Sequence, residues 1–336
     1  MKKVVIMFKN KTVLITGGTG TLGLALTKRL LKMDVSTIRI YSRDELKQTK
    51  MQEEFSDERL RFFIGDVRDE KRLHRAMDGV DIVFHTAALK QVPIGEYNPF
   101  ETIKTNVYGT QNVVEACYDK EVQASVAIGT DKAVSPLNTY GASKLLMEKI
   151  FTSANFYRGS HKTKFITVRY GNVLGSRGSI IPKLLEQIGN KNEITITDPK
   201  MTRFNITQNQ AVDLVLRALK YGRGGEIFVP KLKAYTVETV KDAILELVNR
   251  KVKVKQIPVR PGEKKHEMLI NENEIEIAYE SESDYIIPTL GIENIVSSMH
   301  LSLKKANLSS PYTSSNVELL DKEELKRLIV EEGLIQ

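Results

Sequence analysis

Lys11-Thr12-Val13-Leu14-Ile15-Thr16-Gly17-Gly18-Thr19-Gly20-Thr21-Leu22-Gly23 joins a run of apolar and β-branched residues to glycines in the spacing G-x-x-G-x-x-G. An apolar stretch with helical spacing, Leu24 to Leu31, follows. We predict a buried strand, a tight turn and a helix whose first turn carries little side-chain bulk. Such a turn lets a diphosphate lie against backbone N–H groups at the helix N-terminus. The residues expected to contact it are Gly17, Thr19, Gly20, Thr21, Leu22 and Gly23.

A second motif, Tyr140-Gly141-Ala142-Ser143-Lys144, gives this turn more weight. The four-residue spacing puts Tyr140 and Lys144 on one face of a helix. A nearby ammonium favours the phenolate, so we expect the pKa of Tyr140 to fall and the tyrosine to act as a base. The alternative, a solvated tyrosine and lysine, is less consistent with a position directly after the fifth strand of such a sheet. Together the two motifs indicate nucleotide-dependent redox chemistry.

Composition excludes several other classes of protein. The chain has 336 residues, a formal charge of +8, 41% hydrophobic residues and a single cysteine, Cys117. The lysines are scattered without interleaved aromatics, so we expect no nucleic-acid partner. The five histidines lie far apart, so we expect no metal site. No apolar run could span a bilayer, and the opening Met1–Met7 is too short for a signal core, so we expect a short N-terminal extension and a cytoplasmic protein.

Strand and helix patterns alternate through the first half of the chain. This alternation predicts a doubly wound, Rossmann-type α/β fold with a parallel sheet covered on both faces. The predicted strands are Thr12–Thr16, Thr37–Ser42, Leu60–Gly65, Ile82–Thr86, Ala124–Gly129 and Phe165–Tyr170. The predicted helices are Leu22–Lys32, Asp44–Phe55, Glu70–Met77, Phe100–Tyr118 and Tyr140–Tyr157.

Beyond Gly171 the pattern changes to short strands and helices separated by proline and glycine. We therefore divide the chain into a nucleotide-binding domain (1–171), a smaller substrate-binding lobe that partly returns to it (172–306), and a polar linker with a tail helix (307–336). The predicted strands here are Ile194–Thr197, Glu226–Val229, Val254–Val259 and Tyr285–Pro288, and the predicted helices are Ile180–Gln187, Gln208–Tyr221, Val237–Asn249 and Leu319–Val330.

With these motifs the chain resembles the extended short-chain dehydrogenase/reductase superfamily, from Phe8 to about Pro288. The supporting residues are His85-Thr86-Ala87-Ala88 after the fourth strand, Asn106 on the next helix and Thr130 after the fifth strand. The resemblance implies that Ala87, Ala88 and Asn106 line a cofactor and that Thr130 binds the sugar hydroxyl that is oxidised.

Thr130-Asp131-Lys132 narrows the resemblance, because a dehydratase needs an acid–base pair beside that threonine to eliminate water. The chain is similar to the configuration-inverting UDP-N-acetylglucosamine 4,6-dehydratases of pseudaminic acid synthesis, which carry Asp-Lys where retaining enzymes carry Asp-Glu. The matching stretches are Tyr41–Gln48, Phe63–Asp69, Ala87–Pro93, Arg169–Val173, Met201–Phe204 and Arg260–Lys264.

The resemblance implies a lyase with an internal redox cycle. Tyr140, supported by Lys144, removes the 4-hydroxyl proton, Lys132 removes the C5 proton, and Asp131 protonates the departing 6-hydroxyl. The implied product is UDP-2-acetamido-2,6-dideoxy-β-L-arabino-hexos-4-ulose. Lys132 must be neutral to act as a base, whereas Asp131 would raise its pKa and desolvation would lower it. The alternatives are a UDP-sugar 4-epimerase, a retaining dehydratase, or a cofactor-sensing regulator, which would not need the Tyr/Lys pair.

The residues after the second and third strands bear on the cofactor. An acid after the second strand would bind the ribose of NAD, whereas the basic Ser42-Arg43 favours the 2′-phosphate of NADP. Asp44 is adjacent and weakens this argument. Asp66 and Val67 are expected to border the adenine. Because the redox cycle returns its hydride, we expect NADP to be tightly bound and recycled.

The expected substrate residues lie mostly in the smaller lobe. Arginine offers forked donors suited to a diphosphate and to uracil edges. We expect Lys90 to border both cofactor and sugar, and the UDP end to meet Asn172, Arg177, Arg203, Arg260 and Glu263. The apolar helices Phe100–Tyr118 and Tyr140–Tyr157 correspond to the dimer-forming pair of the superfamily, so we expect a homo-oligomer.

Overall fold

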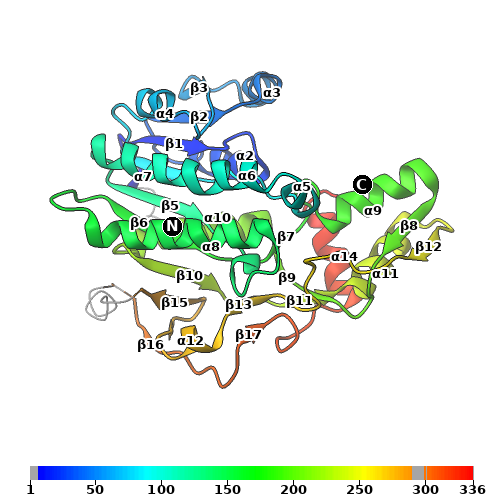
Figure 1. The fold of residues 1–336 in the computed structure, drawn as a ribbon. Helices are drawn as coiled ribbons and strands as arrows, with labels where there is room; N and C mark the ends of the chain where they lie inside the picture. Colours follow the sequence, from blue (N-terminus) through cyan, green and yellow to red (C-terminus); the bar gives the residue numbers. More distant parts are fainter. Residues whose placement is uncertain (1–6, 290–298, 300, 336) are drawn as a thin grey trace.

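A ten-stranded sheet organises the described part of the chain, with the order β16-β14-β15-β10-β6-β5-β4-β1-β2-β3 (Figure 1). The computed structural model describes residues 7–289, 299 and 301–335; the expected N-terminal extension, apart from Met7, lies outside them. The strands of the sheet are β1 (Thr12–Thr16), β2 (Thr37–Ser42), β3 (Leu60–Ile64), β4 (Ile82–His85), β5 (Ala124–Ile128), β6 (Lys164–Val168), β10 (Glu226–Pro230), β14 (Tyr279–Glu280), β15 (Asp284–Pro288) and β16 (Lys304–Lys305).

Seven neighbouring strands of this sheet, in the spatial order β10-β6-β5-β4-β1-β2-β3, run parallel, in agreement with the predicted Rossmann-type fold. β1 lies between β2 and β4, with Val13 beside both Ile38 and Ile82. The chain proceeds outward from β1 in one direction to β2 and β3, and in the other from β4 onward. This reversal is the topological switch point, where an open α/β sheet forms its ligand crevice at the carboxyl ends of the strands.

Helices cover both faces of the sheet because its strands are apolar on both sides. On one face α2 (Thr21–Leu30) packs against α10 (Gln208–Tyr221), with Leu26, Leu30 and Val215 fully buried. On the other face α4 (Glu70–Ala76), α7 (Gly109–Asp119) and α8 (Thr139–Tyr157) pack side by side (Figure 1). The helix α3 (Glu45–Phe55) lies against β2 and β3.

The predicted helix Phe100–Tyr118 is divided into three segments. These are α6 (Pro99–Ile103), a π-helical turn η1 (Lys104–Tyr108) and α7, and they follow a helix that the sequence pattern did not indicate, α5 (Val92–Tyr97). A single π-helical turn inserted in a helix is often found at a functional site. Here it carries Asn106, whose side chain binds the backbone of Leu89 from both its amide oxygen and its amide nitrogen.

The smaller lobe lies beyond the carboxyl ends of the parallel strands (Figure 1). Its core contains Ile181, Leu184, Ile194, Ile244 and Leu325. Its elements are β7 (Asn172–Val173), α9 (Ile180–Lys191), β8 (Glu193–Ile196), β9 (Thr202–Ile206), β11 (Ala234–Thr236), α11 (Val237–Val248), β12 (Lys253–Gln256) and α14 (Lys322–Glu331).

Strands from the second half of the chain join the main sheet. β10 pairs in parallel with β6, and β15 pairs antiparallel with β10, so both extend the main sheet. The predicted polar linker Leu308–Asn316 is packed: its strand β17 (Tyr312–Thr313) pairs with β13 (Met268–Ile270), and Tyr312 is buried against Phe204. Between β13 and β14 lies the short helix α12 (Glu272–Ile275).

A largely buried ion cluster connects α8 to this returning segment. Arg169, at the end of β6, forms ion pairs of 2.8 Å with Glu148 on α8 and 2.9 Å with Glu274 on α12, and it donates to the carbonyl of Leu269 at 2.8 Å. Burial alone would lower the pKa of Arg169, but the two carboxylates raise it above its ordinary value. The guanidinium therefore stays charged.

We predict that Arg169→Met lowers the free energy of unfolding by about 3–5 kcal/mol, because it leaves two carboxylates buried without their cation. Arg29→Met is the control, since Arg29 pairs with Asp213 at a partly exposed position and should contribute less than about 1 kcal/mol. Urea unfolding followed by circular dichroism measures both. Equal effects of the two substitutions would contradict the structural role assigned to Arg169.

Candidate active site

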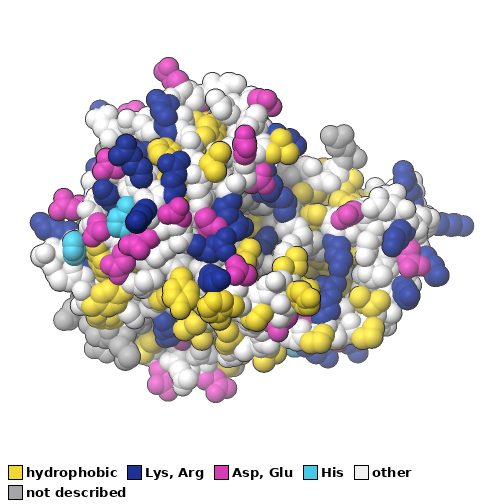
Figure 2. All heavy atoms as spheres, turned by 45° about the horizontal axis from the view of Figure 1, so that its top comes forward, with side chains coloured by type: hydrophobic (Ala, Val, Ile, Leu, Met, Phe, Trp, Pro, Cys, Tyr) yellow, Lys and Arg dark blue, Asp and Glu magenta, His cyan; other side chains and the backbone are white. Residues whose placement is uncertain are grey.

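A cavity of about 970 Å³ opens at the switch point, between the main sheet and the smaller lobe. Lys and Arg side chains gather around the hollow on this face (Figure 2). Eighteen of the predicted residues line the cavity: Gly17, Thr19, Gly20, Thr21, Leu22, Ser42, Arg43, Asp66, Val67, Ala87, Ala88, Lys90, Thr130, Lys132, Tyr140, Lys144, Asn172 and Arg177. The structure therefore brings the two sequence motifs to one site.

The glycine-rich turn packs closely against neighbouring backbone, which glycine permits. Gly17 has a φ of +64°, and a Cβ there would lie 2.8 Å from the backbone nitrogen of Ala87. A Cβ on Gly23 would collide with the carbonyl oxygen of Gly18. The N-cap residue Gly20 offers no side-chain acceptor, so the N–H groups in the first turn of α2 remain available for an anion. This cradle fits the diphosphate of a dinucleotide.

Buried hydrogen bonds hold the opposite wall, after β4, in position. The ring of His85 lies between the hydroxyls of Thr16 at 2.8 Å and Thr110 at 3.1 Å. Burial lowers the pKa of His85 to about 3, so the ring is neutral and serves as a hydrogen-bonding spacer. Thr86 donates to the carbonyl oxygen of Thr16 at 2.7 Å. Asn106 does not line the cavity; it supports this wall from behind, through its bonds to Leu89.

At the far end of the cavity, Asp44 is the acid next to Arg43 that could bind a ribose hydroxyl, but its carboxylate is bound to Lys47. Asp44 caps α3 by accepting from the backbone nitrogen of Lys47 at 3.0 Å, and it also pairs with the Lys47 ammonium. Arg43 lies 3.5 Å from Asp66, whose carboxylate is mainly bound by Arg68 at 2.6 Å. The geometry leaves the Arg43 guanidinium half-exposed at the cavity wall, as a cation near the end of β2.

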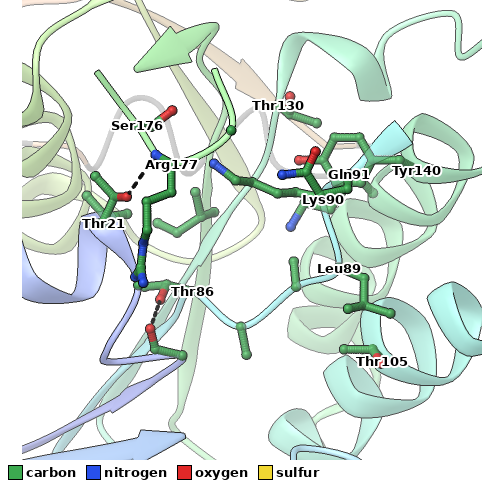
Figure 3. Close-up of a pocket in the computed structure, with 18 of the residues that line it drawn as sticks. Thr21, Thr86, Leu89, Lys90, Gln91, Thr105, Thr130, Tyr140, Ser176 and Arg177 are labelled. Carbon is green, nitrogen blue, oxygen red and sulfur yellow. Dashed lines mark hydrogen bonds between the residues drawn. The ribbon is translucent and has the colours of Figure 1, made fainter. Parts of the chain in front are cut away.

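Tyr140 is positioned by the start of α8. Asn138 caps this helix by accepting from the nitrogen of Gly141 at 2.8 Å, and its side-chain nitrogen donates to the carbonyl of Gly262 at 2.9 Å. A Cβ on Gly141 would collide with the carbonyl oxygen of Lys132, so the glycine lets the helix lie directly on that peptide. Tyr140, Thr130 and Lys90 consequently face the same part of the cavity (Figure 3).

The predicted fall in the pKa of Tyr140 does not occur in the structure. Burial raises this pKa to about 12 and outweighs the lowering effects of the Lys132 charge and of the Thr130 hydrogen bond. Burial also lowers the pKa of Lys144 to about 8, against the raising effect of Glu148. Lys144 is thus still mostly an ammonium at neutral pH and becomes neutral in mildly alkaline solution, and its nitrogen donates to the sulfur of Met147 at 2.8 Å.

Lys132 lies between two carboxylates, which decide its charge in the resting structure. Its ammonium nitrogen lies 3.0 Å from Asp131 Oδ1 and 3.0 Å from Glu267 Oε1. Burial would lower the pKa of Lys132, but the two carboxylates raise it above its ordinary value. The resting lysine is therefore an ammonium. Glu267 is a site residue that the sequence did not indicate.

Several predicted residues lie behind the cavity wall or beside it. Asp131 is fully buried, and its Oδ1 accepts from Thr130 Oγ1 at 3.0 Å. Arg203 pairs with Glu263 at 3.2 Å and lies 4.0 Å from Glu267. Arg260 lines a separate, adjoining pocket of about 360 Å³ together with Gln91 and Lys183. The predicted residues absent from the wall of the main cavity are Gly23, Asn106, Asp131, Arg203, Arg260 and Glu263.

Arg177 lies at the glycine-rich turn, which is not the position expected of a ligand to UDP. Its guanidinium donates to the carbonyl oxygen of Thr19, and its backbone nitrogen donates to the Thr21 hydroxyl at 3.4 Å (Figure 3). Lys90 and Asn172 line the cavity as predicted. Burial, together with the charges of Arg177 and Lys132, lowers the pKa of Lys90.

Within 7–289, 299 and 301–335, no group of three or more His, Cys, Asp or Glu side chains could hold a metal ion. None of the helices in these ranges is both long and apolar enough to cross a membrane.

Comparison with known proteins confirms the resemblance to inverting dehydratases. The chain is 47% identical over 285 residues to a UDP-N-acetylglucosamine 4,6-dehydratase (inverting) of Campylobacter jejuni, covering 84% of each chain. It is 43% identical over 335 residues to a UDP-glucose 4-epimerase of Rickettsia rickettsii, covering 98% of each. The crystal structure of Pen from Bacillus thuringiensis superimposes with a TM-score of 0.92 at 40% identity, covering 98% of this chain and 99% of that chain.

These similarities extend over both the glycine-rich turn and the smaller lobe. A family model described as polysaccharide biosynthesis protein matches residues 13–289, which include every predicted site residue. Together with the Rossmann-type sheet and the relatives above, this match shows that the chain belongs to the polysaccharide biosynthesis protein family, on the fold of the extended short-chain dehydrogenases/reductases.

Proposed function

We propose that the protein is a configuration-inverting UDP-N-acetylglucosamine 4,6-dehydratase. The observation that carries the proposal is the Asp131–Lys132 ion pair, which adjoins Thr130 and Tyr140 at one wall of the cavity. A 4-epimerase needs a base for the 4-hydroxyl but no acid–base pair for removing water. The similarity to the Campylobacter jejuni enzyme supports the same reading.

The cofactor proposed for this cavity is NADP, retained through the cycle. When bound, a nicotinamide dinucleotide would accept a hydride from the sugar and return it. The cradle formed by Gly17, Gly20 and the first turn of α2 would hold its diphosphate, and Arg43 its 2′-phosphate. Arg177 would close over the diphosphate from the smaller lobe, because its guanidinium already contacts the turn.

The sugar would lie between Thr130, Tyr140 and Lys132. Thr130 and Tyr140 bind the 4-hydroxyl, and Tyr140 takes its proton, for which its high resting pKa must fall when the site closes. The resulting ketone acidifies C5. The Asp131–Lys132 pair holds one proton, so a shift of that proton to Asp131 makes Lys132 the neutral base for C5 and Asp131 the acid for the 6-hydroxyl. Burial raises the pKa of Asp131 and favours this shift.

The UDP part would extend toward the smaller lobe. Asn172 lines the main cavity, and Arg260 and Lys183 line the adjoining pocket of about 360 Å³. Arg203 and Glu263, paired with each other beside this region, would shape it. The proposed protein is cytoplasmic, and its product enters the synthesis of pseudaminic acid or a related surface sugar.

The second candidate is a UDP-sugar 4-epimerase, favoured by the similarity to the Rickettsia rickettsii protein. Incubation with UDP-N-acetylglucosamine in D₂O, followed by NMR, separates the candidates. A dehydratase gives a 4-keto-6-deoxy sugar with deuterium at C5, and L-arabino couplings in H₂O establish inversion. A D-xylo product would mean retention, and a simple exchange between gluco and galacto configurations would support the epimerase and refute the proposal.

We predict that Lys132→Ala reduces formation of the dehydrated product by about 10²–10⁴-fold while C4 oxidation continues. The reason is that only the elimination needs the C5 base. Acid quenching followed by borodeuteride should label C4 of the trapped 4-keto sugar in this variant, whereas Tyr140→Phe should yield no label. Lys231→Ala is the control, since Lys231 forms a comparable ion pair with Glu280, 2.8 Å long, away from the cavity. Wild-type dehydration by Lys132→Ala would contradict its assignment.

We predict that Arg43→Ala weakens NADP⁺ binding by about 10- to 100-fold and leaves NAD⁺ binding nearly unchanged, because only NADP⁺ carries the 2′-phosphate. Calorimetric titration of nucleotide-free protein measures both affinities. Arg75→Ala, an exposed substitution on α4, is the control. An equal loss for both nucleotides would remove Arg43 from the phosphate site.

We also propose a homo-oligomer formed through α6, η1, α7 and α8. Large apolar side chains on these elements are about half exposed: Phe100, Tyr108, Leu146, Phe156 and Tyr157. Light scattering at micromolar concentration should give at least a dimer mass, and Phe156→Glu should lower it. Leu46→Glu, at an exposed position on α3, should not change the mass. A monomer mass for the wild type would refute the proposal.

A further inference from the structure

The Lys132 ammonium has two carboxylate partners, and only one of them follows from the sequence motif. Asp131 is its neighbour in the chain, whereas Glu267 comes from the segment just before β13. Both carboxylates are 2% exposed or less, and neither lines the cavity. Of the three residues, Lys132 is the one that lines the cavity in this structure.

Two hydrogen bonds to Ser314 fix the backbone of Glu267 in place. Its nitrogen donates to the Ser314 hydroxyl at 2.9 Å, and its carbonyl oxygen accepts from the Ser314 nitrogen at 2.8 Å. Ser314 in turn lies 2.6 Å from the Thr202 hydroxyl on β9. Since the backbone on both sides is fixed, the Glu267 carboxylate is a stationary partner for a lysine whose side chain is otherwise flexible.

The surroundings of Glu267 favour its charged form. Besides Lys132, the guanidinium of Arg203 and the ammonium of Lys264 each lie 4.0 Å away. Burial alone would raise the pKa of Glu267, but Lys132 and Arg203 lower it below its ordinary value. Its second oxygen, Oε2, is buried without a hydrogen-bond partner among the residues described. The Lys264 ammonium, 4.0 Å from Oε2, is the cation nearest to this oxygen, so the surrounding cations offset part of the cost of burying the carboxylate.

We propose that Glu267 is a positioning residue for the dehydration step: it fixes the Lys132 nitrogen at the cavity wall and keeps one proton within the Asp131–Lys132 pair between turnovers. This inference rests on the proposed function. It assigns to Glu267 no contact with the sugar, because its carboxylate acts through Lys132.

The proton balance explains why such a residue is needed. Before elimination the proton of the pair moves from Lys132 to Asp131. The C5–H bond then breaks and its proton goes to Lys132, while the C6–O bond breaks and the hydroxyl leaves as water with the proton from Asp131. The pair ends with the same single proton it started with. Glu267 keeps its negative charge throughout, so it stabilises the ammonium at both ends of the step.

The test compares Glu267→Gln, which removes the charge but keeps the shape, with Glu267→Asp, which keeps the charge on a shorter side chain. We expect Glu267→Gln to slow dehydration about 10- to 100-fold without lowering the amount of 4-keto sugar trapped by borodeuteride. We expect Glu267→Asp to recover part of the rate. Glu280→Gln is the control, because Glu280 is a buried glutamate between Lys231 and Lys304, at 2.8 and 3.2 Å, on β14, outside the cavity wall.

The pH dependence supplies a readout that a merely structural role would not change. The charged and titratable groups that face Lys132 are Asp131, Glu267, Arg203, Lys264, Lys90, Tyr140 and Tyr235. Dehydration needs the proton of the pair, so it is lost as pH rises through the pKa of Lys132. Removing one carboxylate lowers that pKa, and the alkaline loss should begin about one pH unit or more lower in Glu267→Gln.

A measurement without substrate separates this inference from the proposed function. In nitrogen-15 spectra of lysine-labelled protein, with Lys132 assigned by Lys132→Met, Glu267→Gln should titrate Lys132 at lower pH than the wild type. If the wild type does not dehydrate UDP-N-acetylglucosamine, the proposed function fails. If it does, but Glu267→Gln keeps the wild-type rate, pH profile and Lys132 titration, the inference about Glu267 fails alone. A parallel loss of C4 oxidation and dehydration, with no pH shift, would also overturn it.

Discussion

Two buried cations at the carboxyl ends of the parallel strands depend on carboxylates from a distant part of the chain. Lys132 follows β5 and Arg169 follows β6, while Glu267 and Glu274 flank β13. Asp131 and Glu148 are the local carboxylate partners of the two cations, and the distant segment supplies the second carboxylate of each. Because removing one member of a buried ion cluster is strongly destabilising, the returning segment is as much a part of the nucleotide-binding half as the strands that it joins.

This dependence explains the success and the failure of the sequence analysis. The strand β1, the glycine-rich turn and the Tyr140–Lys144 pair were predictable, because each is a local pattern with a local physical reason. The Asp131–Lys132 pair was predictable because its members are neighbours in sequence. Glu267 was not, since nothing near it in the chain indicates that Lys132 lies 3.0 Å away. A pairing between distant segments leaves no periodic signal in one sequence.

The other differences have the same origin. Periodicity predicted a continuous helix over Phe100–Tyr118 but not the π-helical turn that directs Asn106 toward Leu89. The fall expected for the pKa of Tyr140 came from its spacing to Lys144, whereas burial, which a sequence does not report, decides its direction. Arg177 was assigned to the UDP end by its place in the lobe, yet the fold brings it back to Thr19.

The distance along the chain between these charges has a consequence for how the protein folds. During synthesis, β1 through β6 emerge long before residues 267–274. Lys132 and Arg169 therefore stay exposed to solvent until Glu267 and Glu274 have been synthesised and can pair with them. Closing such large loops is slow, and the last desolvation of the cluster belongs to the end of the pathway. The active-site wall is therefore among the last regions to become native, and a nascent chain that has formed only β1 through β6 still lacks the second carboxylate partner of each cation.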